Sequence, residues 1–248
     1  MPLRKFQIIV QARTNSSRMP GKIIESLPDG KCFLEVQLQR LKRIGLPIIV
    51  ATTENSSDDI IIEQCNRIGI ECFRGSEHNV LDRFIKCAEF LGAENIIRVC
   101  SDNPFIDTNS ILKLAHDYSD EDYLSFSVDG IPSILTHSGF FAEIVKLNAL
   151  RKVSSFSQKN CLEHVTNCIY ASPESFHVRF IPVNSDIISK LRCTLDTKED
   201  WSMLAGIYQN WYLKRIEKDF TYIELVDYLR SQPEKLQLMK QEIKKNTK

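Results

Sequence analysis

The sequence predicts an α/β fold with a mainly parallel sheet, and three observations support this. The apolar runs at 6–10 and 47–51 indicate buried strands, and shorter patterns indicate strands at 70–73 and 95–100. Helical patterns separate these runs, and strands that alternate with helices form βαβ units. Polar loops follow at 12–22, 74–83 and 101–107. Ligands of open α/β sheets bind at the carboxyl ends of the strands, so we expect these loops to border one crevice.

The helices of the first half follow from local patterns. Apolar residues at helical spacing predict the helix at 33–44, and the short polar side chains at 56–59 can cap the next one. Gly92 is a usual helix stop. The predicted elements, in chain order, are a strand at 6–10, a helix at 33–44, a strand at 47–51, a helix from 56 to about 68, a strand at 70–73, a helix at 79–91, a strand at 95–100 and a helix at 107–118.

The pattern is less regular after residue 122. The expected elements there are a strand at 122–128, a strand running into a helix at 134–150, a helix at 162–171, strands at 176–182 and 191–195, a helix at 198–212, and a helical tail from 221 that is broken near Pro233. The sequence shows no internal repeat, low-complexity linker or shift in composition. We therefore expect a single nucleotide-binding domain over 1–248.

Composition narrows the class of protein. The 248 residues carry 32 basic and 32 acidic side chains, a formal net charge of +0, whereas general nucleic-acid binders have a basic excess. No stretch of about 18 apolar residues could span a bilayer, and the N-terminus lacks a signal-peptide core. The eight cysteines form no CxxC pair, and several lie in apolar runs, as reduced buried thiols do. We expect a cytoplasmic protein that binds neither nucleic acid nor membrane.

The first polar loop, at 11–22, carries three cations, Arg13, Arg18 and Lys22, among small polar residues and Gly21. Small residues let backbone N–H groups approach phosphate oxygens, and the arginine and lysine side chains add charged donors. The loop indicates a polyanion site, although a solvated basic loop has the same composition. The P-loop pattern GxxxxGK[ST] is absent.

Two aspartates follow other predicted strands. Asp102 comes after the strand at 95–100, and Asp196 after the one at 191–195. Asp102 has a local alternative, because it can cap the next helix. Thr197 can cap the helix after Asp196, with Asp200 in its first turn, which leaves Asp196 free for another role. Together with the basic loop, the two acids indicate nucleotidyl transfer, in which cations neutralise a triphosphate and carboxylates hold Mg²⁺.

These motifs resemble a family of bacterial cytidylyltransferases, the SpsF-type spore-coat polysaccharide proteins, and more distantly the CMP-KDO and CMP-sialic acid synthetases. The loop at 11–22 fills every fixed position of the signature QARxxSxRxPGK. The resemblance covers essentially the whole chain. Further similar segments are VATTEN at 50–55, FRGSE at 73–77, VLDR at 80–83, SDNPFID at 101–107, EHVT at 163–166 and TLDT at 194–197.

The resemblance implies a three-layer Rossmann-like nucleotide-diphospho-sugar transferase fold with a mixed, mainly parallel sheet. It implies Mg²⁺ on Asp102 and Asp196, with Arg13 and Lys22 on the phosphates of CTP and Arg18 nearby. The other residues that it places around the nucleotide are Ala12, Thr52, Arg74, Gly75, Ser76 and Asp82.

The chain departs from the family pattern at several positions. Ser101, Asn103 and Lys198 replace a glycine, a cysteine and a proline, which leaves CTP binding plausible. Phe141 replaces an aspartate of the acceptor-side segment, while Glu143 is retained. The acceptor therefore stays open among sugar acids, sugar phosphates and phosphonates. Phe141 and its neighbour Phe140 are more typical of a core than of a substrate platform.

Cys161, His164 and Cys168 would lie on one face of the helix predicted at 162–171 and its flank. This arrangement keeps a zinc site open as an alternative, although the sequence shows no evident fourth ligand. His164 is equally an acceptor contact or a structural hydrogen-bonding group.

The expected activity is the transfer of CMP from CTP to a sugar acid or related acceptor, with release of pyrophosphate. The expected catalytic residues are Arg13, Lys22, Asp102 and Asp196. No residue is an evident general base. The alternatives are a glycosyltransferase of the same fold and an inactive nucleotide-binding protein. A homodimer that uses 122–150 is a further expectation.

Overall fold

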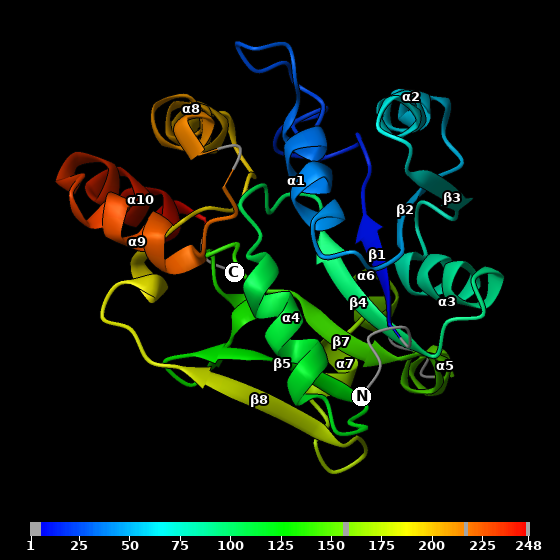
Figure 1. The fold of residues 1–248 in the computed structure, drawn as a ribbon. Coiled ribbons are helices and arrows are strands. Elements are labelled where there is room, and N and C mark those ends of the chain that lie inside the picture. The colour runs from blue at the N-terminus through cyan, green and yellow to red at the C-terminus, as the bar shows by residue number, and fades with distance from the viewer. Residues whose placement is uncertain (1–5, 156–158, 216–217, 247–248) are drawn as a thin grey trace.

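The computed structural model describes residues 6–155, 159–215 and 218–246, whose strands form one eight-stranded sheet. The strand order is β3-β2-β1-β4-β7-β5-β6, and β8 pairs with β5 (Figure 1). The strands are β1 (Phe6–Gln11), β2 (Ile48–Thr53), β3 (Glu71–Gly75), β4 (Asn95–Cys100), β5 (Tyr123–Val128), β6 (Ile131–Pro132), β7 (Glu143–Lys146) and β8 (Val178–Val183).

The sheet is mixed and mainly parallel, as predicted. β1 pairs in parallel with β2 and β4, β2 with β3, and β5 with β8. β7 runs antiparallel to both β4 and β5. The carboxyl ends of β1 and β4 therefore lie side by side, and the loops that follow them meet at one edge of the sheet.

Helices cover both faces of this sheet and give the three layers. They are α1 (Phe33–Lys42), α2 (Asp59–Arg67), α3 (Val80–Phe90), α4 (Thr108–Asp117), α5 (Leu147–Ser154), α6 (Lys159–Glu163), α7 (Asn167–Tyr170), α8 (Lys198–Ile207), α9 (Tyr222–Arg230) and α10 (Pro233–Lys245). Along β1, Ile8 and Val10 pack in the core beneath α1 and α4, whereas Ile9 packs on the other face with α3 and α5. This alternation is the period of a strand buried on both faces.

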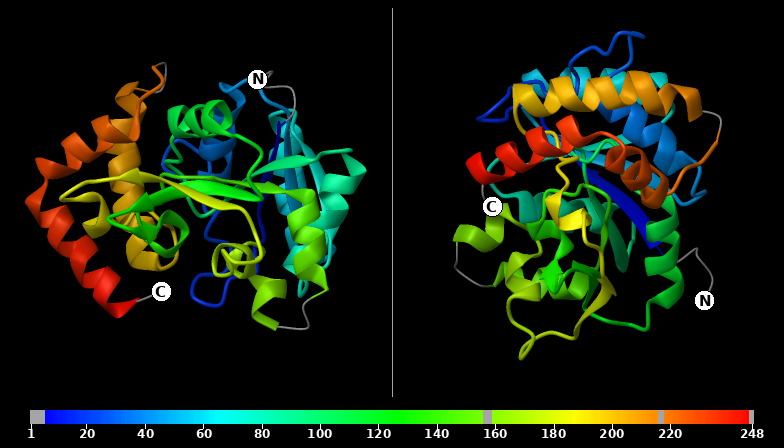
Figure 2. Two further views of the ribbon diagram at one scale, coloured as in Figure 1. Left: turned by 90° about the horizontal axis from the view of Figure 1, so that it is seen from below. Right: turned by 90° about the vertical axis from the view of Figure 1, so that its left-hand side faces the viewer.

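The C-terminal helices α8–α10 lie beside the end of the sheet that carries β5, β6 and β8, and α2 and α3 lie at the opposite end (Figures 1 and 2). Among the described residues, no helix has both the length and the apolar character needed to cross a bilayer.

Four sequence predictions differ from the structure in detail. Residues 191–195 form no strand; their backbone N–H groups bond instead to loop carbonyls, with Cys193 N donating to His137 O at 2.8 Å and Leu195 N to Asp102 O at 2.8 Å. The helix predicted at 162–171 is split, because α6 ends at Glu163, α7 begins at Asn167, and Val165 between them has a φ of +36°.

The third error concerns the helix cap at 56–59. Neither Asn55 nor Asp58 caps the following turn through its side chain. The carboxylate of Asp58 instead accepts hydrogen bonds from Thr14, Thr52 and Thr53, because it lies under the loop that follows β1.

The predicted helix at 198–212 is regular only to Ile207 and continues as a π-helical turn over Tyr208–Tyr212.

Candidate active site

The loop that follows β1 is anchored by a buried carboxylate. Oδ1 of Asp58 accepts from the backbone N–H and the hydroxyl of Thr14 at 2.7 and 2.6 Å, and Oδ2 accepts from the Thr53 hydroxyl at 2.5 Å. Burial alone would raise the pKa of Asp58, but the hydrogen bonds from Thr14, Thr53 and Thr52 outweigh it and lower the pKa below its usual 3.8. The ionised Asp58 therefore ties the cationic loop to β2.

The turn at the end of this loop depends on Gly21. Its backbone N–H donates to Thr14 O at 2.8 Å, and its φ of +72° lies in the left-handed region that favours glycine. The closed turn directs the next residue, Lys22, back toward the sheet.

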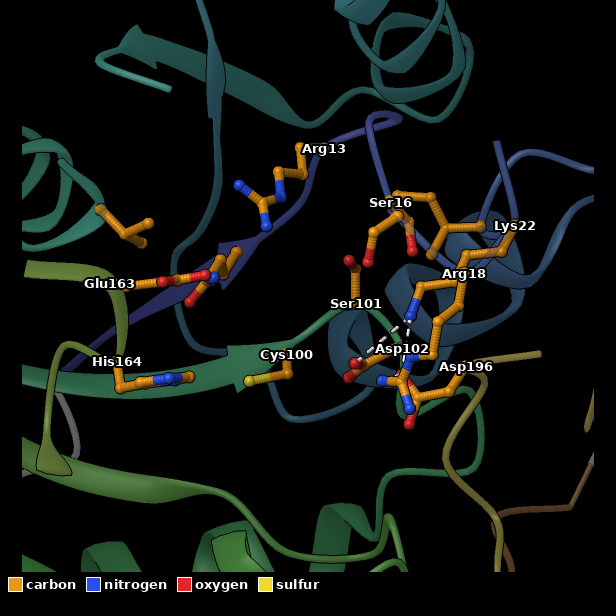
Figure 3. Close-up of a pocket in the computed structure, with 14 residues that line it drawn as sticks. Arg13, Ser16, Arg18, Lys22, Cys100, Ser101, Asp102, Glu163, His164 and Asp196 are labelled. Carbon is orange, nitrogen blue, oxygen red and sulfur yellow. Dashed lines mark hydrogen bonds and ion pairs between the residues drawn. The ribbon is translucent and has the colours of Figure 1, made fainter. Parts of the chain in front are cut away.

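Lys22 and Arg18 meet the two predicted metal-binding aspartates. Nζ of Lys22 lies 3.0 Å from Oδ1 of Asp196 and 3.6 Å from Oδ2 of Asp102. Nη2 of Arg18 lies 2.8 Å from the same Oδ1 of Asp196. The structure thus brings together four of the predicted site residues from three separate segments (Figure 3).

These residues line a cavity of about 320 Å³. Arg13 lies across the cavity from Arg18 and Lys22 and forms no salt bridge within the described parts of the chain (Figure 3). The lining comes from the ends of β1 and β4, their following loops, α3 and two later segments, and comprises Gln11, Arg13, Ser16, Ser17, Arg18, Lys22, Ile23, Val80, Cys100, Ser101, Asp102, Glu163, His164 and Asp196.

The two aspartates suit a divalent cation. Asp102 and Asp196 offer oxygen ligands to the same space, and a positive group, the Lys22 ammonium, already lies between them. Within the described residues, no group of three or more potential ligands gathers at one point. A metal here would take the rest of its coordination from phosphate oxygens and water, as Mg²⁺ commonly does.

The other predicted nucleotide residues do not line this cavity. Ala12 is buried, and its N–H donates to Ala51 O at 3.2 Å. The Thr52 hydroxyl donates to Asp58 at 3.2 Å. Arg74 holds the turn after β2 by donating to Thr53 O, Asn55 O and Asp59. In this structure these three residues support the loops that border the site.

Gly75 is the last residue of β3, Ser76 follows it, and Asp82 lies in the first turn of α3. A Cβ on Gly75 would lie 2.9 Å from Cγ of Arg83, so only glycine lets that side chain pass. The Ser76 hydroxyl accepts from Asn79 N at 3.0 Å, and Asp82 pairs with Lys86 at 2.9 Å. Their assignment to the nucleoside stays a prediction.

Glu163 is a lining residue that sequence reasoning did not assign to the site, although the EHVT motif contains it. It precedes His164, and both face the cavity from the side opposite Asp196 (Figure 3). They lie in a segment closed by a disulfide between Cys161 and Cys168. This bond contradicts the expectation of reduced thiols for that pair, and it removes both sulfurs from the alternative of a zinc site. The other six cysteines are not in disulfide bonds.

The retained acidic residue of the acceptor-side segment is buried. Glu143 pairs with Arg98, accepts from the Tyr123 hydroxyl, and accepts from the Thr166 hydroxyl at 3.1 Å. Arg98 also donates to Gln11 Oε1 at 3.0 Å, which connects the network to the cavity wall. Glu143 therefore supports the wall and does not line the cavity.

Phe140 and Phe141 are buried among aromatic rings, which confirms their assignment to the core. Phe141 also borders a side pocket of about 60 Å³ that shares Cys100 and Asp102 with the main cavity.

Comparison with known proteins settles the family. The model of the cytidylyltransferase family matches residues 7–235. The chain belongs to the cytidylyltransferase family. This confirms the resemblance noted in the sequence, the fold and the assignment as a nucleotidyltransferase that uses CTP.

Among its relatives, the spore coat polysaccharide biosynthesis protein SpsF of Bacillus subtilis is 31% identical over 238 residues, which are 91% of this chain and 94% of SpsF. The solved structure of a cytidylyltransferase from Leptospira borgpetersenii is 26% identical and superposes with a TM-score of 0.79 over 94% of this chain and 97% of that one. A CMP-KDO synthetase solved with CTP, 15% identical, shares the fold with a TM-score of 0.59 over 83% of this chain and 98% of its own.

Proposed function

We propose that this cytidylyltransferase transfers CMP from CTP to a sugar acid or a related acceptor, with release of pyrophosphate, in the synthesis of a surface polysaccharide or glycoconjugate. The observation that carries the proposal is the Lys22 ammonium between Asp102 and Asp196, with Arg18 on the same carboxylate. Each of the two cations lies within 4 Å of a carboxylate there, and nucleotidyl transfer uses both kinds of group, cations to neutralise the triphosphate and carboxylates to hold a divalent metal. The relationship to SpsF supports the polysaccharide setting.

Three cations of the loop after β1 would bind the triphosphate. Arg18 and Lys22 lie on one side of the cavity and Arg13 on the other, so the phosphate chain fits between them. Positive groups fixed at this position stabilise the negative charge that grows on the leaving pyrophosphate, an effect worth several kcal/mol in enzymes of known mechanism.

Asp102 and Asp196 would hold Mg²⁺. When bound, the metal supplies a Lewis acid that stabilises charge on the phosphate oxygens. The two aspartates would fix the position of the metal ion, because Asp196 is almost fully buried and Asp102 follows directly on the end of β4. The acceptor would approach from the side of Glu163 and His164, which line the cavity opposite Asp196.

Three broader expectations remain part of this proposal. We propose that residues 1–248 act as one catalytic domain, that the setting is cytoplasmic, and that the enzyme forms a homodimer through the segment 122–150. The exposed side chains of Ile131 and Leu135, at 50% and 45% exposure, support the last point. Light scattering at two protein concentrations tests it, and a monomer at both would reject it.

Pyrophosphate release from CTP and Mg²⁺ over a panel of acceptors tests the function. The panel contains 3-deoxy-manno-octulosonate, other sugar acids, sugar phosphates and phosphonates. We expect release with at least one acceptor, abolished by Asp102→Asn or Asp196→Asn and unchanged by Asp227→Asn, whose side chain is exposed on α9. Wild-type rates in both site variants would reject the assignment of the aspartates. Consumption of a nucleotide sugar without pyrophosphate release would indicate a glycosyltransferase instead.

A further inference from the structure

Two fully buried charged residues, Arg192 and Asp200, lie directly behind Asp196. Nε of Arg192 donates to Oδ1 of Asp200 at 2.6 Å, and Nη2 donates to Oδ2 at 2.7 Å. A guanidinium and a carboxylate joined by two parallel bonds fix each other's orientation as well as their separation. The pair therefore forms a rigid block beneath the cavity.

Asp200 also holds the backbone of Asp196. Its Oδ2 accepts from the N–H groups of Asp196 and Thr197, each at 3.0 Å. The bond to Thr197 N belongs to a capping box that begins α8, in which the Thr197 hydroxyl accepts from Asp200 N. The bond to Asp196 N lies outside that box. A helix cap does not require it, but it fixes the residue whose carboxylate faces Lys22 and Arg18.

Arg192 orients the side chain of Asp196. Its Nη2 lies 3.7 Å from Oδ2 of Asp196, so the other oxygen, Oδ1, points to the cavity. Nη1 of Arg192 contacts Nδ1 of His137 at 2.7 Å. Arginine only donates hydrogen bonds, so Nδ1 of His137 accepts this one. The guanidinium is thus held from three sides.

We propose that Arg192 and Asp200 are positioning residues that set the metal-binding geometry of Asp196, an inference that rests on the proposed function. Asp196 lies in a segment that belongs to no strand or helix, so no regular backbone ladder fixes its direction. The bond from Asp196 N to Asp200 and the contact of Arg192 with Oδ2 of Asp196 hold this residue in place of regular backbone hydrogen bonds. Loosening the block weakens the binding of a divalent cation and leaves the binding of nucleotide to Arg13, Arg18 and Lys22 in place.

Arg192→Lys tests the inference, because lysine keeps the charge and loses the two-bonded fork. The first readout is Mn²⁺ binding in the presence of CTP, followed by electron paramagnetic resonance. We expect affinity to fall about tenfold, as for other residues that orient a ligand. CTP binding without metal should change less than about twofold. The control, Arg179→Lys, alters the Arg179–Glu121 pair outside the cavity and should leave Mn²⁺ affinity unchanged.

A double-variant comparison separates positioning from general stability. If Arg192 acts through Asp196, Arg192→Lys adds nothing to the loss of Mn²⁺ affinity that Asp196→Asn already causes. A purely structural role predicts that the two losses add. If Arg192→Lys does not fold, His137→Leu, which removes the acceptor of Nη1, should weaken Mn²⁺ binding, and His137→Asn, which can supply an oxygen acceptor, should restore it.

Unchanged Mn²⁺ affinity in folded Arg192→Lys, or in His137→Leu, would overturn the inference, and so would additive losses in the double variant. Wild-type protein that binds neither CTP nor Mn²⁺ would overturn the proposed function and this inference with it. Normal binding by the wild type together with a normal variant would overturn the inference alone.

Discussion

Nζ of Lys22 lies 3.0 Å from Oδ1 of Asp196, so a proposed phosphate-binding cation and a proposed metal ligand are paired before any ligand arrives. Nη2 of Arg18 lies 2.8 Å from the same oxygen of Asp196. A divalent cation that approaches Asp196 must displace these groups. A bound triphosphate gives Lys22 and Arg18 phosphate oxygens to pair with in place of Asp196. The triphosphate therefore frees Asp196 for the divalent cation, and each ligand favours the binding of the other.

The first prediction is strong positive coupling between CTP and Mg²⁺. Each should raise the affinity for the other about tenfold or more, and by the same factor in both directions. Isothermal titration calorimetry of CTP, with and without saturating Mg²⁺, measures this factor. Asp196→Asn should abolish the coupling, because the shared carboxylate charge is gone. Coupling that persists in Asp196→Asn would reflect only the complex that Mg²⁺ and CTP form in solution and would contradict the exchange.

The second prediction concerns the anchor of the cationic loop. Asp58→Asn should lower the free energy of unfolding by about 2 kcal/mol at pH 7, because the carboxylate accepts several hydrogen bonds. The pKa of Asp58 is lowered in the folded state, so its contribution is present above the usual pKa and is lost as the pH falls through the folded-state pKa.

The stability gap between wild type and Asp58→Asn should therefore narrow below about pH 4. Urea denaturation at a series of pH values measures the gap, with the exposed Asp227→Asn as the control. A gap of constant size from pH 7 to pH 3 would contradict the role of the ionised carboxylate.

The third prediction uses a pair of glycines with positive φ. Gly139 has a φ of +68°, and a Cβ there would lie 2.8 Å from Cys193 O, on the segment that leads to Asp196. Gly130 has a φ of +83° with nothing within 4 Å of such a Cβ. Both alanine variants pay the backbone strain of about 1 kcal/mol, but Gly139→Ala should lose at least about 1 kcal/mol more. Equal losses in urea denaturation would mean that the Cys193 contact relaxes freely.

The fourth prediction counts thiols. With the Cys161–Cys168 disulfide in place, alkylation of the denatured, unreduced protein should modify six cysteines, and prior reduction should raise the number to eight. In Cys168→Ser, Cys161 should join the six without reduction. Mass spectrometry reads the number directly. Eight modified cysteines before reduction would show that the pair is reduced in the purified protein.

Strands β1, β2 and β4 were predictable because each is a short run rich in β-branched residues that is mostly buried in the sheet. Ile8, Ile9 and Val10 need no distant information to indicate such a strand. The segment 191–195 alternates apolar and polar residues as a strand does, but it forms no strand, and the N–H groups of Cys193 and Leu195 bond to the carbonyls of His137 and Asp102. Local composition could not distinguish these two environments.

The helix predicted at 162–171 failed for a geometric reason. Seven residues of straight helix would separate Cys161 from Cys168 by about 10 Å along the axis. Their Cα atoms are 5.6 Å apart, which requires the turn at Val165. That turn directly follows Glu163 and His164, which line the cavity.

In the site, sequence motifs predicted Arg13, Arg18, Lys22, Asp102 and Asp196, and the structure gathers all five around one cavity. The capping pattern of Thr197 and Asp200 was also foreseen and is confirmed. The sequence did not predict the contact between Asp200 and Arg192, because the capping role already accounts for an aspartate at position 200. Only the folded chain shows that the cap also holds Asp196.

A thermal-shift titration with CTP, UTP, ATP and GTP, each with and without Mg²⁺, tests the central claim most directly. A ligand present at 100 times its dissociation constant stabilises the folded state by about 2.7 kcal/mol, which raises the melting temperature of a protein of this size by about 5–10 °C. We predict a shift of this order that is selective for CTP and larger with Mg²⁺. The absence of a shift with every triphosphate, in a well-folded sample, would contradict CTP binding at this site.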